Sequence, residues 1–119
     1  MTYPTKEAMA ALNQALRLPA TGREQDWDIE LADPDRVDEF VAYFESHTSS
    51  EGEKHALMAL ILGSLEDLSN KEEVSTELWD RVKRLLRADP GLYADLVKQW
   101  RPKNDDPDGF AISPLLQSL

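Results

Sequence analysis

Apolar residues recur at steps of three and four along five segments of the chain, the spacing that places them on one face of an α-helix. Each segment opens with residues that commonly cap helices. The five predicted starts are Thr5, Asp33 with Pro34, Ser50 with Glu53, Ser75 or Thr76, and Asp89 with Pro90. The predicted ends are Pro19 with Gly22, the linker His47 to Ser50, Leu68, Ala88 and Pro102.

The third predicted helix differs from the others because its residues 56–62 are apolar without interruption. A helix that is apolar on every side is usually surrounded by other elements. We therefore expect residues 56–68 to form a central helix against which the other helices pack. The polar residues 69–73 are predicted to form the turn that follows it.

Residues 26–31 alternate strictly between acidic and apolar side chains. In an extended chain this places Trp27, Ile29 and Leu31 on one side and three carboxylates on the other. No second alternating segment exists to pair with it, so we predict an extended strap packed on the bundle rather than a strand.

Together these patterns predict an all-α fold, a single compact bundle of about five helices in one domain of residues 1–119. The turn-rich tail, residues 103–119, carries apolar residues that need a surface. We expect the tail to dock on its own bundle; the alternative is a segment that becomes ordered on a partner. The predicted core consists of Trp27, Phe40, Phe44, Leu57, Leu60, Ile61, Trp79, Val82, Leu96 and Trp100.

Charge is concentrated in one part of the chain. Residues 24–53 contain eleven acidic side chains and one basic one, Arg36, and so account for the whole net charge of -10. Such localisation indicates a surface that faces a cationic partner. Two alternatives remain open: a solvated face, or one balanced by residues 81–103, which hold seven basic and two acidic side chains. The predicted partner-binding residues are Asp26, Asp28, Glu30, Asp35, Asp38, Glu39, Glu45 and Glu51.

Composition narrows the class of function. The chain has no cysteine, which excludes disulfides and thiolate metal sites and fits a reducing, cytoplasmic compartment. A pI near 4.5 argues against direct nucleic-acid binding, which relies on clustered Lys and Arg. The longest apolar run, residues 56–62, is too short to span a membrane.

Four arrangements have residue types found in metal sites or in catalysis. Paired carboxylates in residues 24–53 resemble those of glycoside cleavage, but that chemistry needs a deep pocket in a larger scaffold. Asn104, Asp106, Asp108 and Gly109 match the opening of a calcium loop, but its twelfth position is Leu115 instead of Glu. His47, Glu51 and His55 have metal-ligand spacing, although a predicted helix start separates the histidines. Ser64 lacks the surroundings of a nucleophile elbow. We expect no catalytic, cofactor or metal site.

The sequence therefore predicts a non-enzymatic, acidic binding protein, of the inhibitor or immunity type, that occludes a basic partner such as a nuclease or toxin. The first alternative is a scaffold subunit that self-associates, for example as a homodimer, through its acidic and basic parts. The second alternative is a small enzyme or metal-binding protein.

Overall fold

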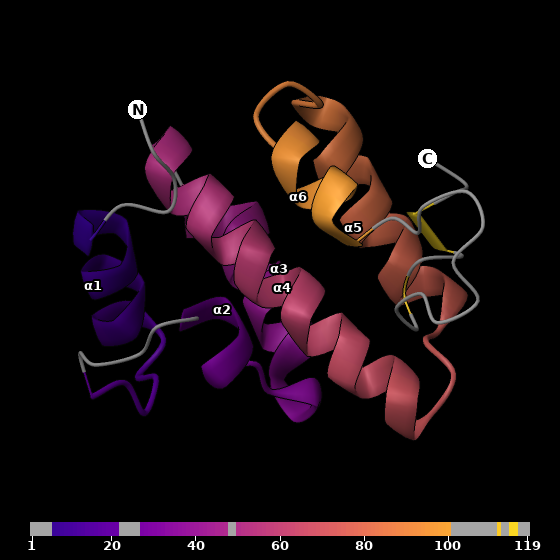
Figure 1. The fold of residues 1–119 in the computed structure, drawn as a ribbon, viewed down its shortest axis with the longest axis horizontal. Coiled ribbons are helices and arrows are strands. Elements are labelled where there is room, and N and C mark those ends of the chain that lie inside the picture. Colours follow the sequence, from indigo (N-terminus) through magenta and orange to yellow (C-terminus); the bar gives the residue numbers. More distant parts are fainter. Residues whose placement is uncertain (1–5, 22–26, 48–49, 101–111, 113–114, 117–119) are drawn as a thin grey trace.

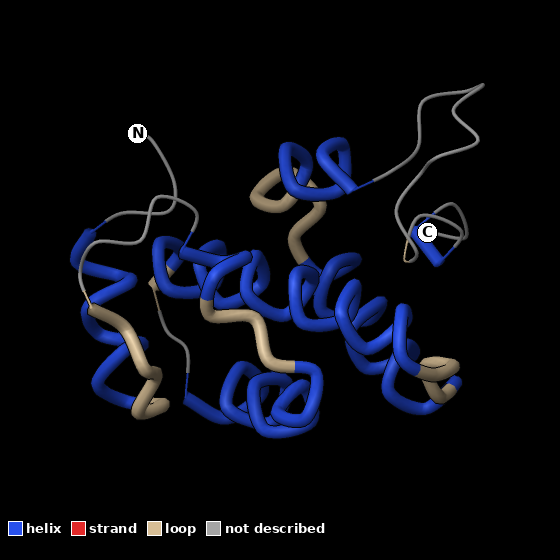
Figure 2. Tube along the Cα trace, turned by 60° about the horizontal axis from the view of Figure 1, so that its bottom comes forward, coloured by secondary structure: helices blue, strands red, loops and turns tan. Residues whose placement is uncertain are grey.

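The computed structural model describes residues 6–21, 27–47, 50–100, 112, 115 and 116. These residues contain helices and no strand, so the predicted all-α class is confirmed (Figures 1 and 2). None of the described helices is long and apolar enough to cross a membrane. The elements are α1 (Lys6–Ala15), α2 (Trp27–Glu30), the 3-10 helix η1 (Pro34–Arg36), α3 (Val37–His47), α4 (Glu51–Lys71), α5 (Thr76–Ala88) and α6 (Ala94–Trp100).

Helix α4 is the central element, as its apolar composition predicts. It crosses the molecule diagonally, with α1 and α2 on one side and α5 and α6 on the other (Figure 1). Helices α1, α2, η1 and α3 pack against α4, and α5 packs against α3. Every residue from His55 to Leu65 is buried. The burial of consecutive positions shows that α4 has no solvent-facing side over these three turns.

The core prediction is confirmed at all ten positions, which are buried to 7% exposure or less. The buried apolar side chains form one cluster that takes residues from all six α-helices. The assignment of residues 1–119 to a single domain stays a prediction, because parts of the chain lie outside the described residues.

The predicted extended strap is wrong: residues 27–30 form the helical turn α2. Trp27 and Leu31 are buried, and the Leu31 amide donates to the Trp27 carbonyl at 3.1 Å, whereas Ile29 is 50% exposed. The pattern misled because positions i and i+4 share a side in both a helix and a strand. The indole of Trp27 donates to Asn13 Oδ1 at 2.8 Å, which ties α2 to α1.

A glycine sets the distance between α2 and α4. A Cβ atom added at Gly63 would lie 2.7 Å from the backbone carbonyl oxygen of Asp28 and 3.6 Å from the Cβ of Ala32. The nearest atom belongs to the backbone and cannot rotate away. The close packing of α2 on α4 therefore requires glycine at position 63.

We expect Gly63→Ala to lower the free energy of unfolding by about 1–3 kcal/mol, because the added methyl group overpacks the contact with α2. This outweighs the roughly 0.5–1 kcal/mol that alanine gains over glycine inside a helix. Gly91→Ala is the matched control, since nothing lies within 4 Å of a Cβ at position 91. Urea unfolding followed by circular dichroism compares the two variants. Equal stability of both would contradict the packing argument.

Three of the predicted helix caps are confirmed. Asp33 Oδ1 accepts from the Asp35 amide at 3.0 Å. Ser50 Oγ accepts from the Glu53 amide at 3.1 Å. Ser75, rather than Thr76, caps α5 by accepting from the Leu78 amide at 3.1 Å. Thr5 lies outside the described residues.

Three predicted boundaries need correction. Helix α1 ends at Ala15, before Pro19, and Arg17 has a left-handed φ of 52°. Helix α4 continues to Lys71, so most of the predicted turn 69–73 is helical, and the Glu72 amide donates to the Leu68 carbonyl at 2.8 Å. Helix α6 begins at Ala94, after a turn in which the Leu92 amide donates to the Asp89 carbonyl at 3.1 Å. Gly91 disfavours a helix here. Burial of Tyr93 to 1% exposure fixes the turn in the core.

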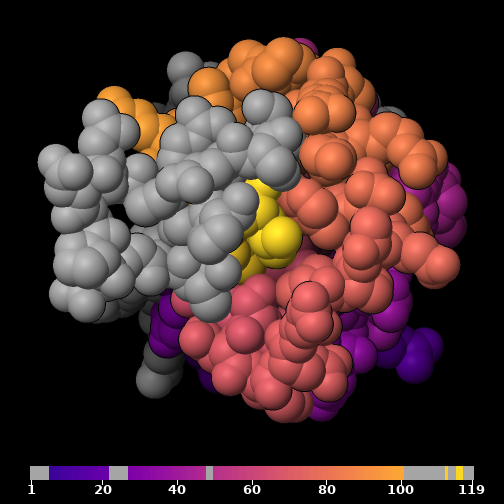
Figure 3. Space-filling view, turned by 90° about the vertical axis from the view of Figure 1, so that its right-hand side faces the viewer, coloured from indigo at the N-terminus to yellow at the C-terminus, as the bar shows by residue number. Residues whose placement is uncertain are grey.

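The described tail residues lie against the bundle (Figure 3). Ile112 and Leu116 are buried to 1% and 0% exposure and belong to the core cluster. The Ile112 amide donates to Glu66 Oε1 of α4 at 3.0 Å. The remaining tail residues, including the calcium-like motif 104–109, lie outside the described residues, so docking of the whole tail stays a prediction.

Candidate functional site

The predicted partner-binding residues are distributed over four elements. Asp28 and Glu30 lie on α2, Asp35 lies in η1, three residues lie on α3, and Glu51 is the first residue of α4. Asp26 lies outside the described residues. The three on α3 are Asp38, Glu39 and Glu45.

Arg36, the only cation of the acidic stretch, neutralises part of it. Its Nε donates to Glu39 Oε1 at 2.9 Å. The hydrogen bond from Arg36 lowers the pKa of the Glu39 carboxyl, although partial desolvation acts in the opposite direction. The same guanidinium donates to the Leu16 carbonyl at 2.6 Å and lies 5.1 Å from the centre of the Phe40 ring. Arg36 therefore joins the end of α1 to α3.

A second cation reaches the acidic face from the basic part of the chain. Arg81 of α5 donates to Glu45 at 2.7 Å and lies 3.6 Å from Asp38. The hydrogen bond from Arg81 lowers the pKa of Glu45. Lys71, at the end of α4, lies 3.5 Å from Asp35. The alternative of internal charge balance therefore has a physical basis at these residues, and it weakens the acidic face along α3.

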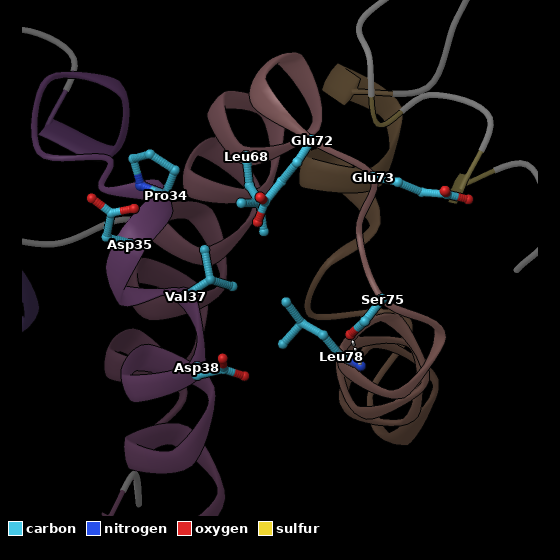
Figure 4. Close-up of a pocket in the computed structure, with 9 residues that line it drawn as sticks. All are labelled: Pro34, Asp35, Val37, Asp38, Leu68, Glu72, Glu73, Ser75 and Leu78. Carbon is cyan, nitrogen blue, oxygen red and sulfur yellow. Dashed lines mark hydrogen bonds between the residues drawn. The ribbon is translucent and has the colours of Figure 1, made fainter.

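Four acidic residues, Asp35, Asp38, Glu72 and Glu73, line a pocket where α3, the end of α4 and the start of α5 meet (Figure 4). The pocket has a volume of about 300 Å³. Val37, Leu68 and Leu78 supply its apolar surface. Asp38 and Glu72 extend into the gap between the helices, whereas Glu73 points away from it (Figure 4). The other lining residues are Pro34 and Ser75.

The pocket has more acidic than basic side chains around it. Four of its lining residues are acidic, and Lys71 and Arg81 are the cations paired with two of them. The side chains of Asp35 and Asp38 are 81% and 82% exposed, so their ion pairs are screened by water. Both carboxylates therefore remain accessible to an incoming cation.

Sequence reasoning missed Glu72 and Glu73. Both residues fall in the predicted turn 69–73. They are more than thirty residues from Asp35 along the chain, so the sequence gives no reason to group them with Asp35. The structure brings them together because α3 and α4 run antiparallel, which returns the end of α4 to η1. The available signal was the local sequence Lys71-Glu72-Glu73, which is separated by one residue from the Ser75 cap.

Glu51 is not part of this site. It begins α4, whereas the pocket lies at the other end of the same helix. A helix of 21 residues is about 30 Å long. The predicted set therefore divides into four groups. Asp28 and Glu30 lie on α2, Asp35 and Asp38 lie at the pocket, Glu39 and Glu45 form ion pairs along α3, and Glu51 lies at the opposite end of α4 from the pocket.

The two histidines of the sequence lie in different surroundings. His55 is buried to 1% exposure, and its Nε2 lies 3.0 Å from Asp95 Oδ1, joining α4 to α6. His47 is exposed at the end of α3, where its ring stacks on Tyr43 at 4.8 Å. The described residues contain no group of three metal-ligating side chains. Ser64 is buried and accepts from the Asp33 amide at 3.0 Å.

Comparisons with protein families, with curated proteins and with solved structures found no match to this chain. The geometry of the site therefore carries the functional argument alone.

The pocket has the chemical character of a receptor for a long cationic side chain. Lysine and arginine combine an apolar stem with a charged end, and they bury the stem along apolar surface while the charge stays at a polar rim. Partly buried Leu68 offers apolar surface for the stem, and the largely buried Val37 and Leu78 lie behind it. Asp38 and Glu72 match the charged end.

Proposed function

We propose that this protein is a non-enzymatic binding module whose acidic surface occludes a basic protein partner, in the manner of an inhibitor or immunity-type protein acting on a nuclease or another cationic toxin. The observation that carries the proposal is the pocket between α3, α4 and α5, where Asp38 and Glu72 flank an apolar surface. The basic partner would insert one lysine or arginine side chain there.

The charge distribution supports capture of a cationic partner. The net charge of -10 belongs to residues 24–53, and α3 and η1 carry the part of that stretch next to the pocket. A localised field of this kind steers an oppositely charged protein toward the surface and raises the association rate. The pocket then provides what a uniform field lacks, a defined point of contact.

The ion pairs with Lys71 and Arg81 reduce the free energy that a cationic partner would gain at the pocket. An incoming arginine or lysine competes with cations that already lie 3.5 Å and 3.6 Å from Asp35 and Asp38. Because these pairs are exposed, each is worth roughly 0.2–1 kcal/mol and is easily replaced. The energy of binding would come mainly from burial of the partner's anchor residue and from the pocket carboxylates around it.

The test begins with affinity capture from the lysate of the source organism at low and at moderate salt. We expect a basic protein to be retained at low salt and released as salt rises, because screening weakens exposed charge pairs. The dissociation constant of that protein is then measured by titration calorimetry. Asp38→Asn with Glu72→Gln should raise it by about tenfold or more, since the anchor would lose its paired carboxylates.

Two neutral variants serve as controls. Glu7→Gln removes a charge on α1, outside the acidic stretch, and Glu51→Gln removes one at the far end of α4. Each control removes one negative charge away from the pocket, which weakens only the long-range attraction of the partner. We therefore expect each to raise the dissociation constant by no more than about twofold. Unchanged affinity of the pocket variant, with intact folding by circular dichroism, would contradict the proposal. Recovery of no basic protein at either salt concentration would do the same.

A further inference from the structure

The outward side of α5 carries a charged stripe that the proposed function does not use. Leu78, Trp79, Val82 and Leu86 form the buried side of this helix. At 100° per residue, the opposite side presents Glu77, Asp80, Arg84 and Arg87. The two acidic residues come first and the two basic residues follow. We call these four residues the α5 stripe.

The spacing within the α5 stripe is symmetric. Its members are separated by three, four and three residues, so the stripe reads the same from either end except that the charge is reversed. A second stripe laid antiparallel to the first therefore places each acidic residue opposite a basic one. Glu77 meets Arg87 of the second copy, and Asp80 meets Arg84 of the second copy, in the same register.

The helix macrodipole does not account for this arrangement. It favours acidic residues in the first turn and basic residues in the last turn of a helix, and its effect fades beyond them. Glu77 and Arg87 occupy those turns. Asp80 and Arg84 lie between those two turns. Asp80 lies 3.6 Å from Lys83 in an ion pair within the same helix.

The surface at this stripe is hollowed. A depression of about 230 Å³ is lined by Asp80, Lys83, Arg84 and Arg87. Glu77, Arg84 and Arg87 are exposed, and Asp80 and Lys83 are half-buried. The stripe thus offers both complementary charge and a recess that receives side chains from a facing helix.

We propose that the α5 stripe pairs with the same stripe of a second copy, antiparallel and about a two-fold axis, to form a homodimer. Closed two-fold symmetry makes each ion pair occur twice, as expected for an interface that uses one surface on both subunits. Because exposed ion pairs are individually weak, the dimer forms at high protein concentration and low salt and dissociates as salt rises. This contact is independent of the pocket and of the basic partner.

The test uses two reversal variants of the full chain and sedimentation equilibrium. One variant, Glu77→Arg with Asp80→Arg, makes the stripe wholly basic, and the other, Arg84→Glu with Arg87→Glu, makes it wholly acidic. Each alone should raise the dimer dissociation constant by about tenfold or more, because identical stripes then repel. An equimolar mixture of the two should recover dimers, since opposite stripes attract along their whole length.

The control is Lys6→Glu with Glu7→Lys, which reverses two charges on the exposed side of α1 and should leave the dimer unchanged. Circular dichroism checks that every variant keeps its helix content. A wild-type protein that stays monomeric at low salt would overturn the proposal. So would reversal variants that dimerise like the wild type, or a mixture of the two that stays monomeric.

Discussion

Leu60→Ala and Leu62→Ala are each expected to lower the free energy of unfolding by about 2–5 kcal/mol. The two side chains are both fully buried, although they lie about 200° apart around α4. In an amphipathic helix, one of two such positions would face solvent and tolerate truncation. In α4 both truncations leave a cavity, because other elements surround the helix on every side.

Leu85→Ala on α5 is the matched comparison, because Leu85 is only partly buried at the edge of the core. It should cost about 1 kcal/mol, near the average for single substitutions. Chemical unfolding with a common m-value gives the three free energies. A loss below about 1 kcal/mol for either α4 variant would mean that α4 has a side free of tight packing.

Leu116→Ala is expected to lower the free energy of unfolding by about 2–5 kcal/mol, which would be a large effect for a residue of the turn-rich tail. Its side chain is fully buried in the same cluster as the helical core. Truncation therefore removes packing from the fold itself. Thermal and urea unfolding both measure the loss.

Leu115→Ala is the control within the same segment, since Leu115 is only partly buried. A cost for Leu116→Ala several times that for Leu115→Ala would support docking of the tail on its own bundle. Small and equal costs would favour the alternative of a segment that becomes ordered on a partner. The same pair of variants therefore separates the two interpretations of the tail.

The helices were predictable because their signals are local. A run of apolar residues identified α4, and side chains that accept from nearby amides marked its start and the starts of η1 and α5. Nine of the ten predicted core residues followed from the apolar run and from helical periodicity, and Trp27 followed from the alternation in residues 26–31. Each signal depends on residues within one or two turns, so no knowledge of the fold was needed.

The strap failed because its signal was too short to be unique. Six alternating residues fit an extended chain, but a single helical turn also places Trp27 and Leu31 on one side. The close approach of the α2 backbone to α4 at Gly63 decides between the extended chain and the helical turn. Gly63 is more than thirty residues away along the chain, so the sequence of residues 26–31 does not show this contact.

The candidate site shows the same division. Sequence alone determined that negative charge gathers in residues 24–53 and that positive charge gathers after residue 80. The tertiary structure decided which charges meet: Arg81 pairs with Glu45, Lys71 lies by Asp35, and Glu72 joins Asp38 at the pocket. Net charge can be counted from the residues alone. A pocket forms only where helices that are distant in the sequence pack next to each other. The sequence by itself therefore determined most of the helices, the core and the sign of the surface charge, and packing around α4 decided where the carboxylates gather and where the pocket lies.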